Sequence, residues 1–254
     1  MKRIAIIQAR TGSTRLPGKM LHEVVPGLGV LECMVNRVRR CNSLDDIALA
    51  IPDGIADEPL AQYASSFGCR VIRGVEGDVL GHYRIAADAL DLTDDDIVVR
   101  LTGDCPLIDH RVIERVIAFH HSERADFTSN SLEPYTWPDG SDVEVFSAGL
   151  LRKGDREERN PLNRRHVTFC FWKHPKRYRI AYMRHDPDWS AYRITLDYEE
   201  DERLIRAVFA SLYSRNPDFS LDDVIGYLDA NRQIRVLNAH RKRNAGWVAD
   251  ANRD

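Results

Sequence analysis

Short apolar runs alternate with amphipathic segments over the first 121 residues. Strands are predicted where branched apolar residues cluster, at 4–8, 47–51, 69–73 and 97–101. Apolar residues at helical spacing predict helices over 28–40, 58–67, 78–90 and 112–121. Strands that alternate with helices of this length are typical of βαβ units. The first half therefore predicts an α/β fold with a mostly parallel central sheet flanked by helices.

The pattern changes after residue 121. Strands are predicted at 127–131, 142–146, 179–184 and 192–196 without regular helical crossovers, and helices return at 200–213 and 221–231. We interpret 1–240 as a single domain, in which 122–240 forms a smaller strand-rich extension. Residues 241–254 are predicted to be a basic tail whose charges are solvated.

Composition excludes several classes of protein. The chain has 254 residues and a formal charge of −3, so it has no general basic field for nucleic acid. Apolar runs fall well short of the roughly 20 residues that span a bilayer. The five cysteines are odd in number and contain no CxxC pair, which fits a reducing compartment better than disulfides or structural zinc. We expect a cytoplasmic protein that binds neither nucleic acid nor membrane.

A cationic, glycine-containing loop follows the first predicted strand. Parallel sheets bind ligands beyond the carboxyl ends of their strands. Glycines let backbone N–H groups approach an anion, while Arg and Lys neutralise phosphate charge. The loop is therefore predicted to bind a polyphosphate, through Ala9, Arg10, Gly12, Ser13, Arg15 and Lys19.

Two better-known phosphate loops do not fit. A Walker A loop has four residues between its first glycine and Gly-Lys, whereas Gly12 and Gly18 enclose five, and Met20 replaces the magnesium-binding hydroxyl. A dinucleotide fingerprint has the pattern G-x-G-x-x-G. Gly27 and Gly29 match its first two glycines, but Glu32 stands where the third should be. An ordinary solvated loop is the remaining alternative, and the position after the first strand argues against it.

Two aspartates also follow apolar runs. Asp104 lies at the end of the strand at 97–101, on the sheet edge that carries the loop, where a carboxylate can hold Mg²⁺ beside phosphates. Asp109 is better explained as the cap of the next helix. Asp197 follows the strand at 192–196 and could reach the same metal, or serve with Glu200 and Asp201 at a helix N-terminus.

A third acidic pair alternates with apolar residues. Asp142 and Glu144 would share one face of a strand. That face could bind sugar hydroxyls or a second metal, and a solvated face is an equal alternative. No convincing general base is found in the sequence, and His166 is either a hydrogen-bond donor to the acceptor or a partly buried structural histidine.

These residues resemble the cytidylyltransferase family, in particular its spore-coat-polysaccharide type, which is related to the acylneuraminate and 3-deoxy-manno-octulosonate cytidylyltransferases. The first and third of the matching segments are the specific ones. The six matching segments, in chain order, are IIQARTGSTRLPGKML (6–21), GDVLGHYRIAADA (77–89), RLTGDCPLID (100–109), PDGSDVEVFS (138–147), HVTF (166–169) and LDYEEDERLI (196–205).

The resemblance implies a nucleotide-diphospho-sugar transferase fold and Mg²⁺-dependent transfer of CMP from CTP to an acidic sugar or related acceptor. Residues 1–121 would bind the nucleotide, and 122–240 would bind the acceptor and could mediate a homodimer. It implies that the triphosphate contacts Arg10, Ser13, Arg15 and Lys19, that Asp104 and Asp197 hold the metal, and that Arg73 and Asp78 lie where the base is recognised. Asp142, Glu144 and His166 are the candidate acceptor-binding residues.

The chain departs from the family pattern at Gly81, His82, Arg165, Tyr198 and Glu199. These changes bear on which acceptor is used and on which nucleobase is recognised. They leave two alternatives: a glycosyltransferase on the same fold, or a catalytically silent nucleotide-binding subunit. A cytidylyltransferase would release pyrophosphate, a glycosyltransferase would release a nucleoside diphosphate, and a silent subunit would release neither.

Overall fold

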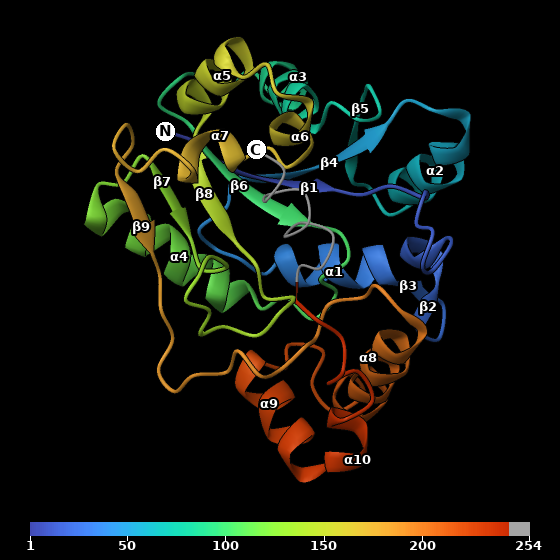
Figure 1. Cartoon of the computed structure of the whole chain (residues 1–254). Coiled ribbons are helices and arrows are strands. Elements are labelled where there is room, and N and C mark those ends of the chain that lie inside the picture. The colour runs from blue at the N-terminus through green and yellow to red at the C-terminus, as the bar shows by residue number, and fades with distance from the viewer. Residues whose placement is uncertain (244–254) are drawn as a thin grey trace.

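A computed structural model describes residues 1–243, and within them the main sheet has seven strands in the order β5-β4-β1-β6-β8-β7-β9 (Figure 1). The strands are β1 (Arg3–Gln8), β4 (Asp46–Pro52), β5 (Arg70–Gly74), β6 (Ile97–Thr102), β7 (Phe127–Ser129), β8 (Glu144–Ser147) and β9 (Ile180–Tyr182). A separate hairpin pairs β2 (Glu23–Val25) with β3 (Leu28–Gly29).

Helices cover both faces of this sheet (Figure 1). They are α1 (Val30–Val38), α2 (Glu58–Ser66), α3 (Val79–Ala89), α4 (His110–Glu123), α5 (Ala148–Glu157), α6 (Pro161–Arg165), α7 (Phe169–Trp172), α8 (Glu199–Leu212), α9 (Leu221–Ala230) and α10 (Arg232–Arg235), with 3₁₀ turns η1 (Lys19–Leu21) and η2 (Ile55–Asp57). No helix within residues 1–243 combines the length and the apolar surface needed to cross a membrane.

The first half forms the parallel part of the sheet, as predicted. β1 pairs in parallel with β4 and β6, and β4 pairs in parallel with β5. Alternate residues of β1 enter two different cores because successive side chains point to opposite faces. Ala5 and Ile7 pack with α1, α4, α8 and α9, whereas Ile4 and Ile6 pack with α3, α5 and α7. The α/β fold class is therefore confirmed.

The second half continues the same sheet with a reversal of strand direction. β8 pairs antiparallel with both β6 and β7, and β9 pairs parallel with β7. Two expectations for this half are wrong. Residues 192–196 form no strand, because only Arg193 makes a bridge, to Asp139. The predicted strand at 142–146 begins two residues later, at Glu144.

Helical segments between 148 and 172 and the β2–β3 hairpin were not predicted. The signals of α6, α7 and the hairpin are weak because α6 has five residues, α7 has four, and each hairpin strand has three or two. The carboxyl ends of β1 and β6 lie side by side, with Gln8 paired to Thr102. The loop at 9–20 and Asp104 therefore leave the sheet at one place.

Candidate active site

The loop at 9–20 is fastened to the body of the protein along its length. Ala9 N–H donates to the carbonyl of Ala50 at 3.0 Å, and Thr11 N–H donates to Asp57 Oδ1 at 2.6 Å. Gly18 has φ of +69°, a left-handed conformation that glycine adopts without strain. It precedes η1, whose first residue is Lys19. The turn thus directs the Lys19 side chain into the protein.

Lys19 lies between the two aspartates that the sequence assigned to a metal. Its side-chain nitrogen Nζ donates to the carbonyl of Leu196 at 2.6 Å, to Asp197 Oδ1 at 3.0 Å and to Asp104 Oδ2 at 3.1 Å. Burial by itself would lower the pKa of Lys19, but the charges of Asp104 and Asp197 outweigh it and raise the pKa above its ordinary value. An ammonium group has three protons to donate, so all three are used.

Close backbone contacts bring Asp104 to this position. Gly103 N–H donates to the carbonyl of Gln8 at 2.8 Å, and a Cβ at Gly103 would lie 3.1 Å from both Ala9 Cβ and Gln8 O. A residue without a side chain therefore lets the loop and the end of β6 approach. The carbonyl of Asp104 in turn accepts Leu196 N–H at 2.8 Å.

The segment at 192–196 delivers Asp197 to the same place. It is extended and hydrogen-bonded on both sides, to Asp104 and, through Ile194 N–H at 2.7 Å, to the carbonyl of Asp139. Burial acts to raise the pKa of Asp197, but Lys19, Arg15 and Arg193 act more strongly together and hold the pKa below its usual range. Arg15 contacts Asp197 Oδ1 at 2.7 Å. Two carboxylates that are far apart in the sequence therefore converge on one cation.

A buried arginine that the sequence analysis did not identify supports this segment. Arg193 donates to Asp139 at 2.6 Å and to both oxygens of Asp201 at 2.9 Å. Asp201 is fully buried and also accepts the backbone N–H groups of Asp197 and Tyr198 at the start of α8. Asp201 is thus a helix-terminal acid, as expected, and in addition the counter-ion of Arg193.

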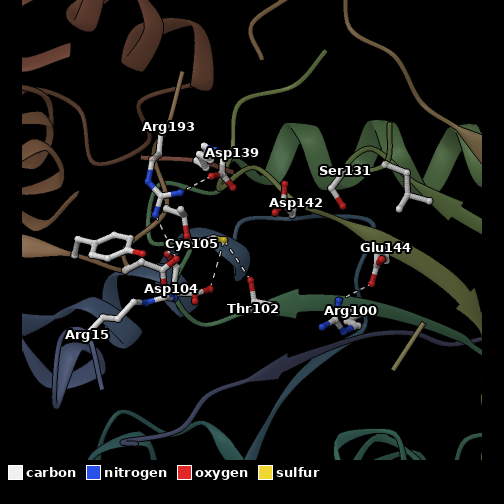
Figure 2. Close-up of a pocket in the computed structure, with 15 residues that line it drawn as sticks. Arg15, Arg100, Thr102, Asp104, Cys105, Ser131, Asp139, Asp142, Glu144 and Arg193 are labelled. Atoms are coloured by element: carbon white, nitrogen blue, oxygen red, sulfur yellow. Dashed lines mark hydrogen bonds and ion pairs between the residues drawn. The ribbon is translucent and has the colours of Figure 1, made fainter. Parts of the chain in front are cut away.

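A cavity of about 230 Å³ opens beside these residues. Figure 2 shows Arg15, Asp104 and Arg193 at one end and Arg100 and Glu144 toward the other. Residues from both halves of the chain line it: Arg15, Arg100, Thr102, Asp104, Cys105, Ser131, Leu132, Asp139, Asp142, Glu144, Arg193, Thr195, Asp197, Tyr198 and Lys242.

Asp142 and Glu144 both face this cavity, although Asp142 precedes the strand. Glu144 accepts from Arg100 at 2.6 Å and from Thr168 Oγ1 at 3.0 Å, and it is buried. Asp142 bonds to Arg243 at 2.9 Å. The pair is therefore not a solvated strand face. Within residues 1–243, no group of three or more potential protein ligands is arranged to hold a metal.

Burial raises the pKa of two carboxyls in the acidic wall of the cavity. Burial, and then the charge of Asp142, raise the pKa of Asp139 to about 7 against the opposing effects of Arg243 and Arg193. Burial raises the pKa of Asp142 as well. This arrangement was not predicted, because isolated polar residues such as Arg100 and Arg193 lie in otherwise apolar runs of the sequence.

Several predicted site residues do not line the cavity, among them Arg10, Arg73, Asp78 and His166. Arg10 is exposed, and Arg73 lies 3.5 Å from Glu58. Asp78 caps α3 by accepting Gly81 N–H at 3.0 Å and pairs with Arg164 at 2.8 Å, while His166 stacks on Phe169 with ring centroids 4.4 Å apart. Their nucleotide and acceptor roles stay predictions. Of the loop residues, Gly12 is exposed and Ser13 Oγ accepts Leu16 N–H at 3.2 Å.

The expectation of a solvated basic tail is wrong for its first residues. Arg241 contacts Glu200 at 2.8 Å and lies 3.9 Å from the centre of the Tyr198 ring, and Arg243 bonds to Asp142. Acidic side chains at the start of α8 and at the cavity attract these cations. The rest of the predicted tail, 244–254, lies outside the described residues.

Comparisons with known proteins point to one family. A family model described as cytidylyltransferase matches residues 4–226. The chain is 32% identical over 233 residues to the spore coat polysaccharide biosynthesis protein SpsF of Bacillus subtilis, covering 89% of this chain and 93% of that protein. It is 29% identical over 249 residues to the 8-amino-3,8-dideoxy-manno-octulosonate cytidylyltransferase of Shewanella frigidimarina, covering 95% and 88%.

A solved structure leads to the same group. A cytidylyltransferase from Leptospira borgpetersenii matches with a TM-score of 0.85 and 30% identity, covering 92% of this chain and 97% of that chain. The family model spans the loop at 9–20, Asp104 and Asp197. The residues that converge in the structure are therefore all within the matched region.

Proposed function

Because the chain belongs to the cytidylyltransferase family, we propose that it transfers CMP from CTP to an acidic sugar, with release of pyrophosphate. The relatives named for spore coat polysaccharide biosynthesis and for an amino-octulosonate substrate support a role in making a surface polysaccharide or glycoconjugate. The five cysteines are buried thiols, which supports a cytoplasmic location.

One observation carries the proposal. Asp104 and Asp197 meet around the ammonium of Lys19, directly beside the cationic loop and the cavity. A triphosphate bound by this loop would have its charge beside Arg15 and Lys19 and its reacting end toward the cavity. The arrangement combines anion binding and carboxylates at the end of one sheet, which is where open α/β sheets bind ligands.

The two aspartates also fit a magnesium ion. They present hard carboxylate oxygens to one point, and that point already attracts a cation, Lys19. We propose that Asp104 and Asp197 hold Mg²⁺, with phosphate oxygens and water as the remaining ligands. The ion would supply charge neutralisation at the phosphates.

The protein's part in the reaction is positioning and electrostatic stabilisation. An acceptor oxygen attacks the α-phosphorus of CTP, the bond to the β-phosphate oxygen breaks, and pyrophosphate leaves. Arg15 and Lys19 offset the negative charge that grows on the leaving group. The buried ion pairs of Arg193 keep the carboxylate of Asp197 in place during this change. The attacking hydroxyl gives up its proton to solvent as the new O–P bond forms, and we assign no residue of the protein as its base.

Pyrophosphate release measured with each of the four nucleoside triphosphates and a set of acidic sugars tests the proposal. We expect release with CTP and an octulosonate or related sugar acid. Release of a nucleoside diphosphate from a nucleotide sugar would identify a glycosyltransferase instead. CTP binding without turnover of any pair would identify a silent nucleotide-binding subunit.

A variant of Asp104 makes this test specific to the site. Asp104→Asn keeps the size of the side chain and removes its charge, so we expect pyrophosphate release to fall roughly 100-fold or more while the fold persists. The exposed Asp95→Asn serves as the matched control and should act like the parent protein. Near-normal turnover by Asp104→Asn would contradict the assigned role.

A further inference from the structure

The segment after α10 forms part of the cavity wall. In Figure 1 the red chain that follows α10 turns back toward the central sheet. Asn238 is buried and donates to the carbonyl of Arg193 at 3.1 Å and to Asp201 Oδ1 at 2.8 Å. This places the segment 238–243, which we call the C-terminal strap, against the same buried network that positions Asp197.

Two arginines fasten the strap on either side of Lys242. Arg241 pairs with Glu200 and lies over the Tyr198 ring. Arg243 donates to the carbonyl of Trp137 at 2.7 Å and to Asp142 at 2.9 Å. Lys242, between them, lines the cavity. The strap therefore places the exposed side chain of Lys242 at the cavity, between two anchored residues.

The charges around the cavity make Lys242 different from the other cations there. Each arginine that lines it is bonded to a carboxylate: Arg15 to Asp197, Arg100 to Glu144 and Arg193 to Asp139. Lys242 has no ion pair within residues 1–243. Among the cations that line the cavity, Lys242 is therefore the one that remains available to an anion that enters it.

We propose that Lys242 binds the carboxylate of the acidic acceptor, and so determines that the enzyme selects an anionic sugar. The inference rests on the proposed function. The triphosphate has the cations of the loop at 9–20, whereas Lys242 belongs to a strap bonded to Asp142, at the acidic wall. The strap also lies beyond residue 226, where the match to the family model ends, so acceptor recognition here uses a segment outside the shared region.

The test compares Lys242→Gln with the parent protein in the pyrophosphate assay, with CTP and 3-deoxy-manno-octulosonate, N-acetylneuraminate and 8-amino-3,8-dideoxy-manno-octulosonate as acceptors. Loss of one charged hydrogen bond should raise KM for the acidic sugar about tenfold, equivalent to about 1.4 kcal/mol. KM for CTP should not change. Lys242→Arg should restore most of the affinity, and the exposed Lys176→Gln, which does not line the cavity, should behave like the parent.

The methyl ester of the same sugar separates charge recognition from a structural effect. The ester lacks the carboxylate, so Lys242→Gln should change its KM little. The effects of esterification and of Lys242→Gln on KM should therefore not add. An unchanged KM for the acid, or an equal rise in KM for CTP, would overturn the role of Lys242 while the proposed function stands. Absence of turnover by the parent protein with every acceptor would overturn both.

Discussion

Lys19 connects the cationic loop to the two acidic strand ends. Replacing it by Met would leave Asp104 and Asp197 facing each other without their shared counter-charge. Removing one member of a buried ion pair is costly, and these aspartates are partly exposed, so we expect a loss of about 1–3 kcal/mol of unfolding free energy near pH 7.

Urea unfolding of Lys19→Met at pH 7 and pH 4 measures this effect. The deficit should shrink at the lower pH, where the unpaired carboxylates take up protons. The exposed Lys176→Met is the control, with little change expected. A Lys19→Met protein as stable as the parent at pH 7 would show that the lysine is not the counter-ion.

His120 gives a prediction on pH. It is buried, and its Nδ1 lies 2.9 Å from Thr128 Oγ1. Burial, and then His121, lower the pKa of His120 to about 4 from an ordinary value of 6.5. The unfolded chain therefore binds more protons than the folded protein between pH 6.5 and 4, and stability is lost as the pH falls through this range, by about 2 kcal/mol at pH 4.5.

His120→Asn should flatten that dependence, because Asn has no proton to gain and can still bond to Thr128. Denaturant midpoints at pH 7 and 4.5 compare the slopes. The exposed neighbour His121→Asn should retain most of the parent's slope. Equal slopes in His120→Asn and the parent protein would refute the assignment.

At the residue scale, the sequence predicted the acids that follow apolar runs and missed the groups that hold them. Asp104 and Asp197 stand out because parallel strands end there. Arg193 and Asp139 do not, since an ion pair within the protein interior has no periodic pattern and no fixed spacing. The departures at Gly81 and His82 have a packing reason: a Cβ at Gly81 would lie 2.4 Å from Asp78, and His82 packs directly on Gly74.

At the scale of elements, the segment 192–196 depends on the turn at Gly140. Gly140 has φ of +104°, and a Cβ there would lie 2.4 Å from Thr195 N. Gly140→Ala must therefore push the segment away from the 138–142 loop, and Asp197 with it. We expect a loss of about 2–4 kcal/mol in unfolding free energy and reduced pyrophosphate release.

Thermal unfolding of Gly140→Ala checks this prediction against Gly226→Ala. Gly226 is exposed inside α9 with nothing within 4 Å, so Ala should stabilise the protein by about 0.5–1 kcal/mol. Opposite signs for the two variants are expected. A neutral Gly140→Ala would mean that the two segments are not held in close contact.

Elements of the first half were predictable because each strand and helix has its own local pattern. β4, β5 and β6 begin and end within a residue or so of the expected positions. The segment 192–196 alternates apolar and polar residues as a strand does, but it bonds to loops on either side. Tertiary contacts decide its structure, and the sequence does not display them.

For the whole molecule, the important fact is that both halves of the chain line one cavity. Asp104 comes from the first half and Asp197 from the second, and the seven-stranded sheet contains strands from both halves. A ligand in this cavity should therefore stabilise the entire domain. At a CTP concentration of about 100 times Kd in the presence of Mg²⁺, the gain is about 2.7 kcal/mol, or about 5–10 °C in Tm.

Differential scanning fluorimetry with CTP, with and without Mg²⁺, measures this shift. Addition of EDTA should reduce it, and Asp104→Asn should show little of it. A CTP-induced rise in Tm as large in Asp104→Asn as in the parent protein would show that the nucleotide does not bind beside Asp104. The homodimer stays a prediction, which sedimentation of the purified protein can test.

Three oxygens accept hydrogen bonds from the Lys19 ammonium, so this side chain occupies the position proposed for the metal ion. Dialysis against a chelator should consequently leave a folded protein, ready for titration with metals one at a time. A divalent ion that binds there must displace the Lys19 ammonium from the two carboxylates, and this ammonium stays attached to the protein. Half-maximal turnover should then require a higher metal concentration in the parent protein than in one whose lysine has been shortened.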